Sequence, residues 1–593
     1  MAKYFTNKEI SRLLEFISAA YEIKNADKFR ILAYQRAAVT IEHLSREVKD
    51  YYDEGRLSNI PGVGPSIAQH LDELFKTGNV QHFKEITKGI PPSVSEFINV
   101  SGIGPKTAFK LAKELNIWSK KNALDRLKKA AEDNKIEKIS SFGKDTQDNI
   151  LQALLRTGVE SKNKERMLLP YAYNLFQEIE YFLKKSQYID EVKALGSLRR
   201  KNSTIGDIDL AIKTSDPSKA IIHVLKFPKI EKVLNQGNKK ITLLLTNNIQ
   251  IDIRAQDPSE WGSMLQHFTG SKDHNIKLRE FARKKNFSLS EYGIKNLKSN
   301  KLMKFNNEID FYQKLGLDFI PPEIREDDGE IEAALNHNLP KLVKLKDIKG
   351  DLHLHSNYPI EPSHDLGKST FEQMIKKANT LDYKYLGFSE HNPSQNKHDE
   401  SDFISILKDK RNYIDKLNYS SSKKYSIKIF NGLEIDIKPD GNLAIPDKAL
   451  SYLDYGIASI HTNFNMNKKA MTDRIIKGLS HPKVKILGHP TGRKIQKREA
   501  YEADWEKIFE FCLKNNKALE INSWPERQDL PDTMVKRAIK AGVLLVINSD
   551  SHRVNHMDLM KYGVYVAQRG WAERKDILNT QSTTVIKKFF NLK

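Results

Sequence analysis

The stretch Gly196-Ser197-Leu198-Arg199-Arg200 … Gly206-Asp207-Ile208-Asp209-Leu210, with Ile251-Asp252-Ile253-Arg254 further along, decides how this chain is interpreted. Side chains alternate along a β-strand, so Asp207 and Asp209 face the same side. Asp252 on a neighbouring apolar strand would complete an all-oxygen site for two hard cations such as Mg²⁺. Paired cations of this kind stabilise the attacking and leaving oxygens of phosphoryl transfer. A bare Asp-x-Asp is more often exposed surface, so the flanking residues support the metal-site interpretation.

Length and composition indicate several domains with real cores. The chain has 593 residues, of which 39% are hydrophobic, and a chain of this length favours three to five compact units. It contains no apolar run of about 18 residues, so we expect no membrane span. The first residues, Met-Ala-Lys-Tyr-Phe-Thr-Asn-Lys-Glu, have no apolar signal core, so we do not expect secretion.

The net charge and the cysteine content limit which binding partners and which cellular location we expect. The formal charge of +21 suits a polyanion such as nucleic acid, since Lys and Arg release counterions from phosphates. A generally lysine-rich composition explains the charge equally well. The single cysteine, Cys512, excludes an intramolecular disulfide and fits a reducing cytoplasm. Any metal ligands must therefore be His, Asp or Glu. As a separate expectation, the protein is a monomer.

Two glycine phrases near the N-terminus predict contacts with a DNA backbone. Residues 1–85 have helical spacing, and Thr6-Asn7-Lys8-Glu9 is a capping pattern for the first helix. Ile60-Pro61-Gly62-Val63-Gly64-Pro65 precedes one helix, and Val100-Ser101-Gly102-Ile103-Gly104-Pro105-Lys106 precedes another. Such glycines allow close backbone approach, and the free N–H groups of the next helix can bind a phosphate. The pattern is that of a helix-hairpin-helix, which reads backbone rather than sequence. The residues expected at the DNA are Gly62, Gly64, Gly102, Gly104, Lys106 and, near the catalytic aspartates, Arg254.

Strand-like segments surround the three aspartates. Residues 188–195, 209–213, 240–245 and 249–253 have strand patterns, and the last two are spaced as a hairpin. We therefore expect a small mixed sheet that carries all three aspartates.

The first 320 residues or so resemble the family X DNA polymerases, relatives of the repair polymerase beta. The phrase Gly-Ser-x-Arg-Arg followed by Asp-x-Asp is similar to the nucleotidyltransferase signature of that family. The resemblance implies that Asp207 and Asp209 bind both metals. It also implies that Asp252 completes the catalytic metal site and accepts the primer 3′-hydroxyl proton. Arg254 is expected as the electrostatic partner of Asp252.

The same resemblance assigns the nucleotide-binding residues. Gly196 and Ser197 would open a helix at the incoming triphosphate, Arg200 would bind phosphate, and Gly206 would keep the loop close. The phrase His267-Phe268-Thr269-Gly270-Ser271-Lys272-Asp273-His274-Asn275 matches the region that excludes a ribose 2′-hydroxyl. Its aromatic pair begins with His267 where relatives have Tyr, which puts ribonucleotide discrimination in doubt. The residues assigned from this phrase are His267, Phe268, Gly270 and Asn275, the last as a contact to the base.

One family activity is not expected. Some relatives cleave a 5′-deoxyribose phosphate through a Schiff-base lysine after the first hairpin motif. His70 occupies that position here, and without the amine the reaction has no nucleophile.

After residue 350, short apolar strands end in potential metal ligands. Gly350-Asp351-Leu352-His353-Leu354-His355 places two imidazoles on one strand face. Mixed His and carboxylate ligands suit Zn²⁺ or Mn²⁺. Polar residues that end successive strands of an α/β region favour a barrel with its site at the C-terminal strand ends. The candidate ligands are His353, His355, His364, Asp365, His391, Glu434, His461, His489, Asp550 and His552.

This region resembles the PHP (polymerase and histidinol phosphatase) domain. The resemblance implies a distorted (β/α)7 barrel with up to three Mn²⁺ or Zn²⁺ ions, and a 3′→5′ exonuclease or 3′-end phosphoesterase activity. Two departures are visible. The loop at 359–367 is longer than usual, and either His364 or Asp365 fits the ligand position there. Glu390-His391 replaces the usual Asp-His but keeps the histidine.

Together these features predict a multidomain α/β protein that fills short gaps in DNA, as in base excision repair, using Mg²⁺ or Mn²⁺. Its substrates would be gapped or primed DNA and dNTPs. An alternative is a PHP nuclease whose polymerase half only binds DNA, and a third is a non-enzymatic scaffold that binds gaps. The expected domains are an N-terminal helical domain at 1–85, a fingers-like subdomain at 86–145, a palm at 146–260, a thumb-like subdomain at 261–320, a linker at 321–346 and a PHP domain at 347–593.

Overall fold

The computed structural model describes residues 5–592 except 43–47, 54, 61, 99, 101–102, 141, 145, 152–153, 155–165, 248 and 423–424. The chain divides into two compact units, Met1–Glu165 and Arg166–Lys593. Among the described residues, no helix combines the length and the hydrophobicity needed to cross a bilayer.

The first unit is helical and has two cores. Its helices are α1 (Asn7–Ile23), α2 (Lys28–Glu42), α3 (Val48–Asp53), η1 (Leu57–Asn59), α4 (Pro65–Thr77), α5 (Gln81–Thr87), α6 (Val94–Phe97), α7 (Pro105–Glu114) and α8 (Ala123–Glu132). The predicted cap of α1 is confirmed, because the Thr6 hydroxyl accepts the backbone N–H of Glu9 at 3.2 Å. Ile10 and Leu14 of α1 pack in the core that contains α4, and Ala20 packs in the core that contains α7. Helix α1 therefore joins the two cores.

The second unit begins with a five-stranded mixed sheet in the order β2-β4-β7-β6-β5. The elements of this region are β1 (Met167–Leu168), α10 (Leu169–Leu183), β2 (Glu191–Ala194), α11 (Gly196–Arg199), β3 (Thr204–Ile205), β4 (Ile208–Lys213), α12 (Pro217–Val224), β5 (Ile230–Gln236), β6 (Lys240–Leu245) and β7 (Gln250–Gln256). Strands β1 and β3 pair with each other in a separate two-stranded sheet. Strands β4 and β7 are parallel, and the other neighbours are antiparallel. Ile208, Leu210 and Ile212 face the core that includes α10 and α12. The predicted mixed sheet and the β6–β7 hairpin are confirmed.

A smaller α/β segment follows the sheet. It comprises η2 (Pro258–Glu260), α13 (Trp261–Thr269), α14 (Lys272–Lys284), β8 (Phe287–Ser290), β9 (Gly293–Asn296), β10 (Leu302–Met303), α15 (Glu308–Lys314), η3 (Pro322–Ile324) and α16 (Glu330–Leu335). The linker interpretation of 321–346 needs correction here. Ile324 and Ile331 are buried with Leu278 and Phe311 in one core. Arg325 is fully buried and donates to Glu308 at 2.7 Å. Residues 322–335 therefore complete this segment rather than connect two domains.

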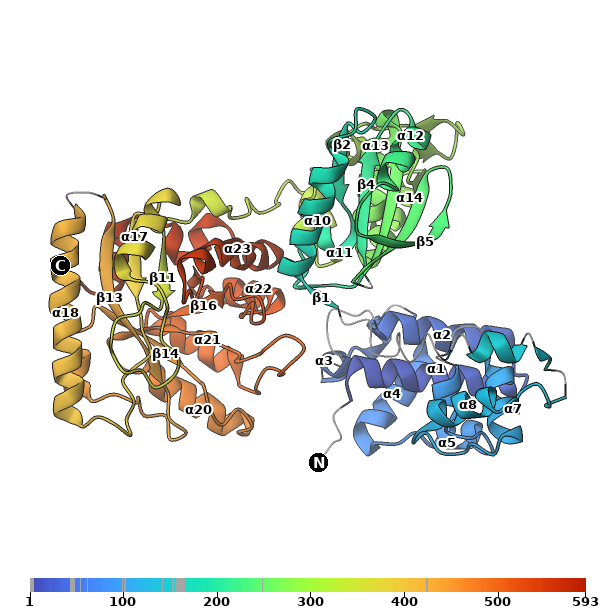
Figure 1. Cartoon of the computed structure of the whole chain (residues 1–593), viewed down its shortest axis with the longest axis horizontal. Coiled ribbons are helices and arrows are strands. Elements are labelled where there is room, and N and C mark those ends of the chain that lie inside the picture. Colours follow the sequence, from blue (N-terminus) through green and yellow to red (C-terminus); the bar gives the residue numbers. More distant parts are fainter. Residues whose placement is uncertain are drawn as a thin grey trace. The chain divides into compact units, whose positions relative to one another are not determined.

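The last part is a nearly closed parallel barrel of seven strands in sequence order. Its elements are η4 (Leu345–Asp347), β11 (Gly350–Leu354), α17 (Phe371–Thr380), β12 (Tyr385–Phe388), α18 (Glu400–Ser422), β13 (Lys428–Asp436), α19 (Asp447–Leu450), β14 (Tyr455–Ser459), α20 (Lys468–Leu479), β15 (Val484–Leu487), α21 (Trp505–Lys514), β16 (Ala518–Asn522), α22 (Asp532–Lys540), β17 (Leu545–Asn548), η5 (Val554–Leu559), α23 (Met560–Arg569), η6 (Arg574–Asp576), η7 (Leu578–Thr580) and α24 (Thr583–Phe589). A bridge between Leu354 and Ser551 nearly closes the sheet, and helices surround it (Figure 1). The predicted barrel is confirmed.

The C-terminal segment fills the end of the barrel where the strands begin. Tyr385 and Tyr455, the first residues of β12 and β14, are buried in one cluster with Phe590. The Tyr455 and Phe590 rings stack with their centroids 4.3 Å apart. With this end closed by apolar side chains, polar side chains gather at the other end, as in parallel barrels generally.

Candidate active sites

The three aspartates of the mixed sheet lie together. Asp209 on β4 and Asp252 on β7 are directly paired in the parallel register, so their side chains share one face. Asp207 lies immediately before β4. Burial, Asp252 and Asp207 raise the pKa of Asp209 to about 6. The site thus gathers negative charge that a bound cation would offset.

Asp252 is surrounded by donors that the sequence did not reveal. Its carboxylate accepts from the Thr242 hydroxyl at 2.6 Å and lies 3.1 Å from the Lys240 ammonium. Burial opposes ionisation, but these hydrogen bonds hold the pKa of Asp252 below its ordinary value. The Arg254 guanidinium lies 3.8 Å from the Phe268 ring centroid and its charge opposes the burial that raises the pKa of Asp209, so its expected pairing with Asp252 stays a prediction. The β6–β7 register places Thr242 directly opposite Asp252. Working out this register for the predicted hairpin would have identified these donors.

The predicted nucleotide-binding residues adjoin this site. Gly196 opens α11 with φ +53°, and a Cβ there would be 2.9 Å from the Asp209 carboxylate. The close approach therefore requires glycine. Ser197 follows in the same helix, and a Cβ on Gly206 would be 3.2 Å from the Arg166 guanidinium.

The His267–Asn275 segment adjoins the strand that carries Asp252. The rings of His267 and Phe268 meet edge to face, 4.7 Å apart, and Phe268 stacks under Arg254. Asn275 donates to the His267 carbonyl at 2.7 Å. That bond orients the Asn275 side chain toward its own segment, so contact with a base stays a prediction.

The two hairpin phrases have matching backbones in the described residues. Gly64 and Gly104 are the N-caps of α4 and α7, with φ/ψ of −75°/172° and −77°/168°. Gly62 has φ +80°. Lys106 donates to Asn25 at 2.7 Å, and Gly102 lies outside the described residues. The equal cap geometry presents the free N–H groups of both helices in the same way.

The C-terminal ends of the barrel strands form a second cluster around Glu434. Its carboxylate lies within 3.5 Å of ring nitrogens of His353, His355, His391, His461 and His489. These histidines and Glu434 come from β11 to β15 or the residues directly after them. The arrangement confirms that the strand ends converge as predicted.

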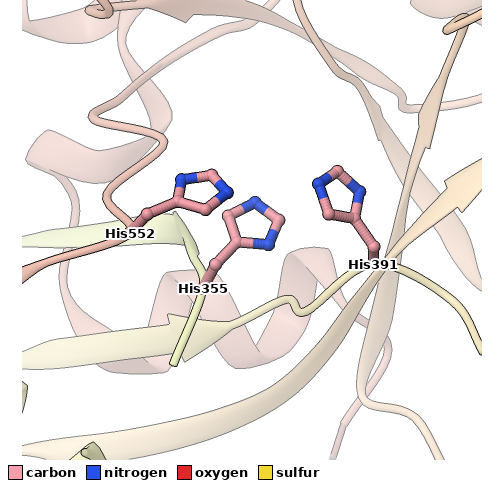
Figure 2. A group of neighbouring side chains, drawn as sticks. All are labelled: His355, His391 and His552. Atoms are coloured by element: carbon pink, nitrogen blue, oxygen red, sulfur yellow. The ribbon is translucent and has the colours of Figure 1, made fainter. Parts of the chain in front are cut away.

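Asp550 and His552, after β17, complete the opposite side of the cluster. Asp550 lies 3.2 Å from His355, and the rings of His355 and His552 stack at 4.1 Å. Figure 2 shows the imidazoles of His355, His391 and His552 converging from three different segments. Asp550 (φ +54°) and His489 (φ +27°) have strained backbones, a feature that concentrates at functional sites.

The loop at 359–367 contributes both of its alternative residues. His364 lies 3.1 Å from Asp436, and Asp365 lies 3.4 Å from His391 and 3.3 Å from His552. Both side chains therefore lie at the cluster, on different sides of it, and which of them is a metal ligand stays a prediction.

Two carboxylates of this cluster were absent from the predicted set. Asp436, at the end of β13, accepts from His461 at 2.6 Å. Glu520 on β16 accepts from His353 Nδ1 at 2.7 Å and from the His489 backbone at 2.6 Å. Asp436 ends its strand, so a search of every strand end would have found it, whereas Glu520 is the third residue of β16.

The donor set fits metal ions. Within the described part of the chain, four groups of three side chains each offer ligand atoms that lie within 4.8 Å of one another: His355, His391 and His552; His353, His355 and Asp550; His364, Asp436 and His461; His391, Glu434 and His461. His353 Nε2 and both ring nitrogens of His355 are buried without a hydrogen-bond partner among the described residues. Burial and the neighbouring His552 hold the pKa of His355 well below its ordinary value, so its ring stays neutral and able to ligate.

A cavity of about 620 Å³ opens onto this cluster. Basic side chains on its wall are those of Lys368, Lys494, Arg498, Arg527 and Arg553, and its aromatic side chains include Phe464 and Trp524. A buried Nη1 of Arg527 has no hydrogen-bond partner in the described part of the chain. The wall therefore suits an anionic ligand with a flat ring.

Comparison with known proteins finds relatives of both halves of the chain. Family models match as a helix-hairpin-helix domain (residues 5–80), a SAM-like helix-hairpin-helix tandem (94–155), a DNA polymerase beta thumb (264–326) and a PHP domain (351–524). A probable phosphatase of Clostridium acetobutylicum is 30% identical over 34% of the chain and 78% of its own length. DNA polymerase lambda of Rattus norvegicus is 23% identical over 54% of the chain and 56% of its own length.

One relative matches throughout. The DNA polymerase/3′-5′ exonuclease PolX of Bacillus subtilis is 34% identical over 98% of this chain and 99% of its own. Both metal-ligand clusters fall within that match. The chain accordingly belongs to the PolX family, in which a family X polymerase is followed by a PHP domain.

Proposed function

We propose that this chain is a DNA-directed DNA polymerase that fills short gaps during repair of the base excision type and degrades DNA 3′ ends with its barrel domain. The observation that carries the proposal is the presence of two groups of candidate ligands: Asp209 and Asp252 paired on the mixed sheet with Asp207 just before β4, and a histidine-rich cluster in the barrel. The substrates are gapped or primed DNA and dNTPs. A monomeric state and a cytoplasmic location, which the free Cys512 suits, belong to the same proposal.

In the polymerase half, Asp207, Asp209 and Asp252 hold two divalent ions, Mg²⁺ or Mn²⁺. Bound ions would lower the pKa of the primer 3′-hydroxyl and stabilise charge on the transferred phosphoryl group. Asp252 accepts the hydroxyl proton, and Thr242 and Lys240 keep it ionised and oriented. Ser197 and Arg200 bind the triphosphate.

In the barrel, histidines and carboxylates hold up to three ions, Mn²⁺ or Zn²⁺. Bound ions would supply an activated water for hydrolysis of a phosphodiester. Glu520 fixes the tautomer of His353, since its carboxylate accepts from Nδ1 and leaves Nε2 toward the cluster. Arg527 binds the phosphates of the DNA end, and Trp524 provides a surface for a terminal base.

The helix-hairpin-helix segments bind the DNA backbone. The N–H groups at the starts of α4 and α7 face the phosphates without reading sequence. Lys106, in the first turn of α7, adds a positive charge there.

A primed one-nucleotide gap tests the two activities in one experiment. With dNTPs and Mg²⁺ or Mn²⁺ the primer should be extended, and without dNTPs its 3′ end should be shortened. Shortening without any extension would support the alternative of a nuclease whose polymerase half only binds DNA.

Asp436→Asn is expected to slow 3′-end degradation by roughly 10- to 100-fold, the usual cost of losing a carboxylate that orients a metal-binding histidine. The reason is that Asp436 accepts from both His461 and His364. Initial rates on a 3′-labelled single strand would measure the loss. Asp440→Asn, an exposed aspartate in the turn that follows β13, is the matched control. An unchanged rate in Asp436→Asn would remove Asp436 from the site.

A further inference from the structure

The residue after α11 is held by partners outside the mixed sheet. Arg200 donates through Nε to Glu326 at 3.0 Å and through Nη1 to the Thr269 carbonyl at 2.6 Å. A Cβ on Gly270 would be 3.2 Å from the same Nη1. Only 12% of the Arg200 side chain is exposed. Its direction is therefore set by Glu326 and by the turn at Thr269.

Glu326 is shared with an arginine of the barrel domain. Arg569, the last residue of α23, donates through Nη1 to the same Glu326 oxygen at 2.9 Å and to the Arg200 carbonyl at 3.0 Å. Its Nε donates to Asp532, the first residue of α22, at 2.7 Å. The Arg569 side chain is 8% exposed. Arg569 therefore links the barrel to Arg200, both through Glu326 and through the Arg200 backbone.

The charges of this group balance. Burial opposes ionisation of Glu326, but Arg200 and Arg569 hold its pKa below the ordinary value. Two guanidinium groups and the carboxylates of Glu326 and Asp532 sum to zero. Without Arg569 the net charge of this group is negative. The whole charge of Glu326 then acts on Arg200.

Helix α23 also contacts Lys201, next to Arg200, and the core of the mixed sheet, and these contacts do not involve Arg569. The Lys201 ammonium lies 4.6 Å from the Tyr173 ring centroid and 4.8 Å from that of Tyr565 on α23. Tyr562 of α23 is 2% exposed within the core of the mixed sheet. Loss of Arg569 alone should therefore leave α23 in place.

We propose that Arg569 is a positioning residue for nucleotide addition: by sharing the negative charge of Glu326, it keeps Arg200 oriented and leaves part of its positive charge available to the incoming triphosphate. The nuclease domain thus completes the triphosphate site of the polymerase. This inference rests on the proposed role of Arg200 in binding the triphosphate.

Arg569→Ala in the full chain is expected to raise KM for dNTP about 10-fold, with a smaller change in kcat. The reason is that Glu326 loses one of its two arginine partners and then pairs with Arg200 alone, which weakens the binding of the triphosphate by Arg200. Gap filling at varied dNTP concentration measures both constants. Degradation of a 3′-labelled single strand without dNTPs should keep its wild-type rate. Arg537→Ala, which removes an exposed arginine of α22 paired with Glu506, is the matched control and should change neither activity.

A second substitution separates positioning from a general structural role. Glu326→Gln combined with Arg569→Ala removes the excess negative charge and should lower KM for dNTP back toward the wild-type value. Arg569→Lys, which keeps the charge, should give an intermediate KM. Equal losses of kcat and nuclease rate in Arg569→Ala, with no rescue by Glu326→Gln, would overturn the inference.

Arg200→Ala distinguishes the two proposals. A raised KM in Arg200→Ala with an unchanged KM in Arg569→Ala would leave the proposed function standing and reject the inference alone. An unchanged KM in Arg200→Ala would instead reject the proposed role of Arg200, and the inference with it.

Discussion

Asp252→Asn is expected to reduce nucleotide addition by about 10³-fold or more, since removal of one member of a catalytic constellation typically costs at least that much. Asparagine has nearly the same shape but lacks the charge that a cation and the primer proton require. In the structure Asp252 pairs in register with Asp209 and accepts from Thr242. Single-turnover extension of a primed one-nucleotide gap would measure the loss.

The matched control for this prediction is Asp190→Asn, which changes an exposed aspartate beside β2 of the same sheet. It should extend the primer at the wild-type rate. Both variants should shorten a 3′ end normally when dNTPs are absent, because the barrel is untouched. Continued synthesis by Asp252→Asn would show that nucleotide addition does not depend on this carboxylate.

His355→Ala is expected to slow 3′→5′ degradation by more than about 100-fold, because a direct ligand should matter more than the outer-shell partners whose loss costs roughly 10- to 100-fold. His355 belongs to two of the ligand groups, and both of its ring nitrogens are buried without hydrogen-bond partners in the described residues. Release of nucleotides from a 3′-labelled single strand measures the rate, and retained gap filling shows that the polymerase half is intact.

His481→Ala provides the control, because His481 lies just before β15, at the end of the barrel opposite the cluster. This variant should degrade DNA normally. The bound metal content of the His355→Ala protein gives a second readout and should fall relative to that of His481→Ala. Normal metal content and normal degradation in His355→Ala would exclude His355 as a ligand.

Local motifs and their resemblance to family X polymerases were sufficient to predict the polymerase fold and its aspartates. Alternation predicted that Asp207 and Asp209 share a face and that Asp252 joins them from a neighbouring strand. Asp207 lies just before β4, and the register of the sheet places Asp252 beside Asp209. The pairing of Asp252 with Arg254, two residues away on the same strand, stays a prediction. The structure adds an ion pair of Asp252 with Lys240, from the neighbouring strand β6. Proximity in sequence does not reveal which cation a fold brings across a sheet.

The barrel shows the same limit at larger scale. Strand-ending histidines were visible because each stands directly after an apolar run. Asp436 was missed because a lone carboxylate at the end of a strand is common, and Glu520 was missed because it lies within β16. The charged stretch after Pro321 was interpreted as a linker because charge usually marks solvent. Arg325 is instead buried against Glu308, and only the fold shows that its charge is paired.

Sequence by itself determined the fold class, the two ligand clusters and the order of the domain-like segments along the chain, because periodicity and dense motifs are encoded locally. Tertiary structure decided which side chains meet. It placed both His364 and Asp365 at the cluster, surrounded Asp252 with Thr242 and Lys240, and set Arg569 beside Glu326 and Arg200. The last contact joins residues 243 positions apart. Pairings of this kind depend on how whole elements pack, and no local pattern records them.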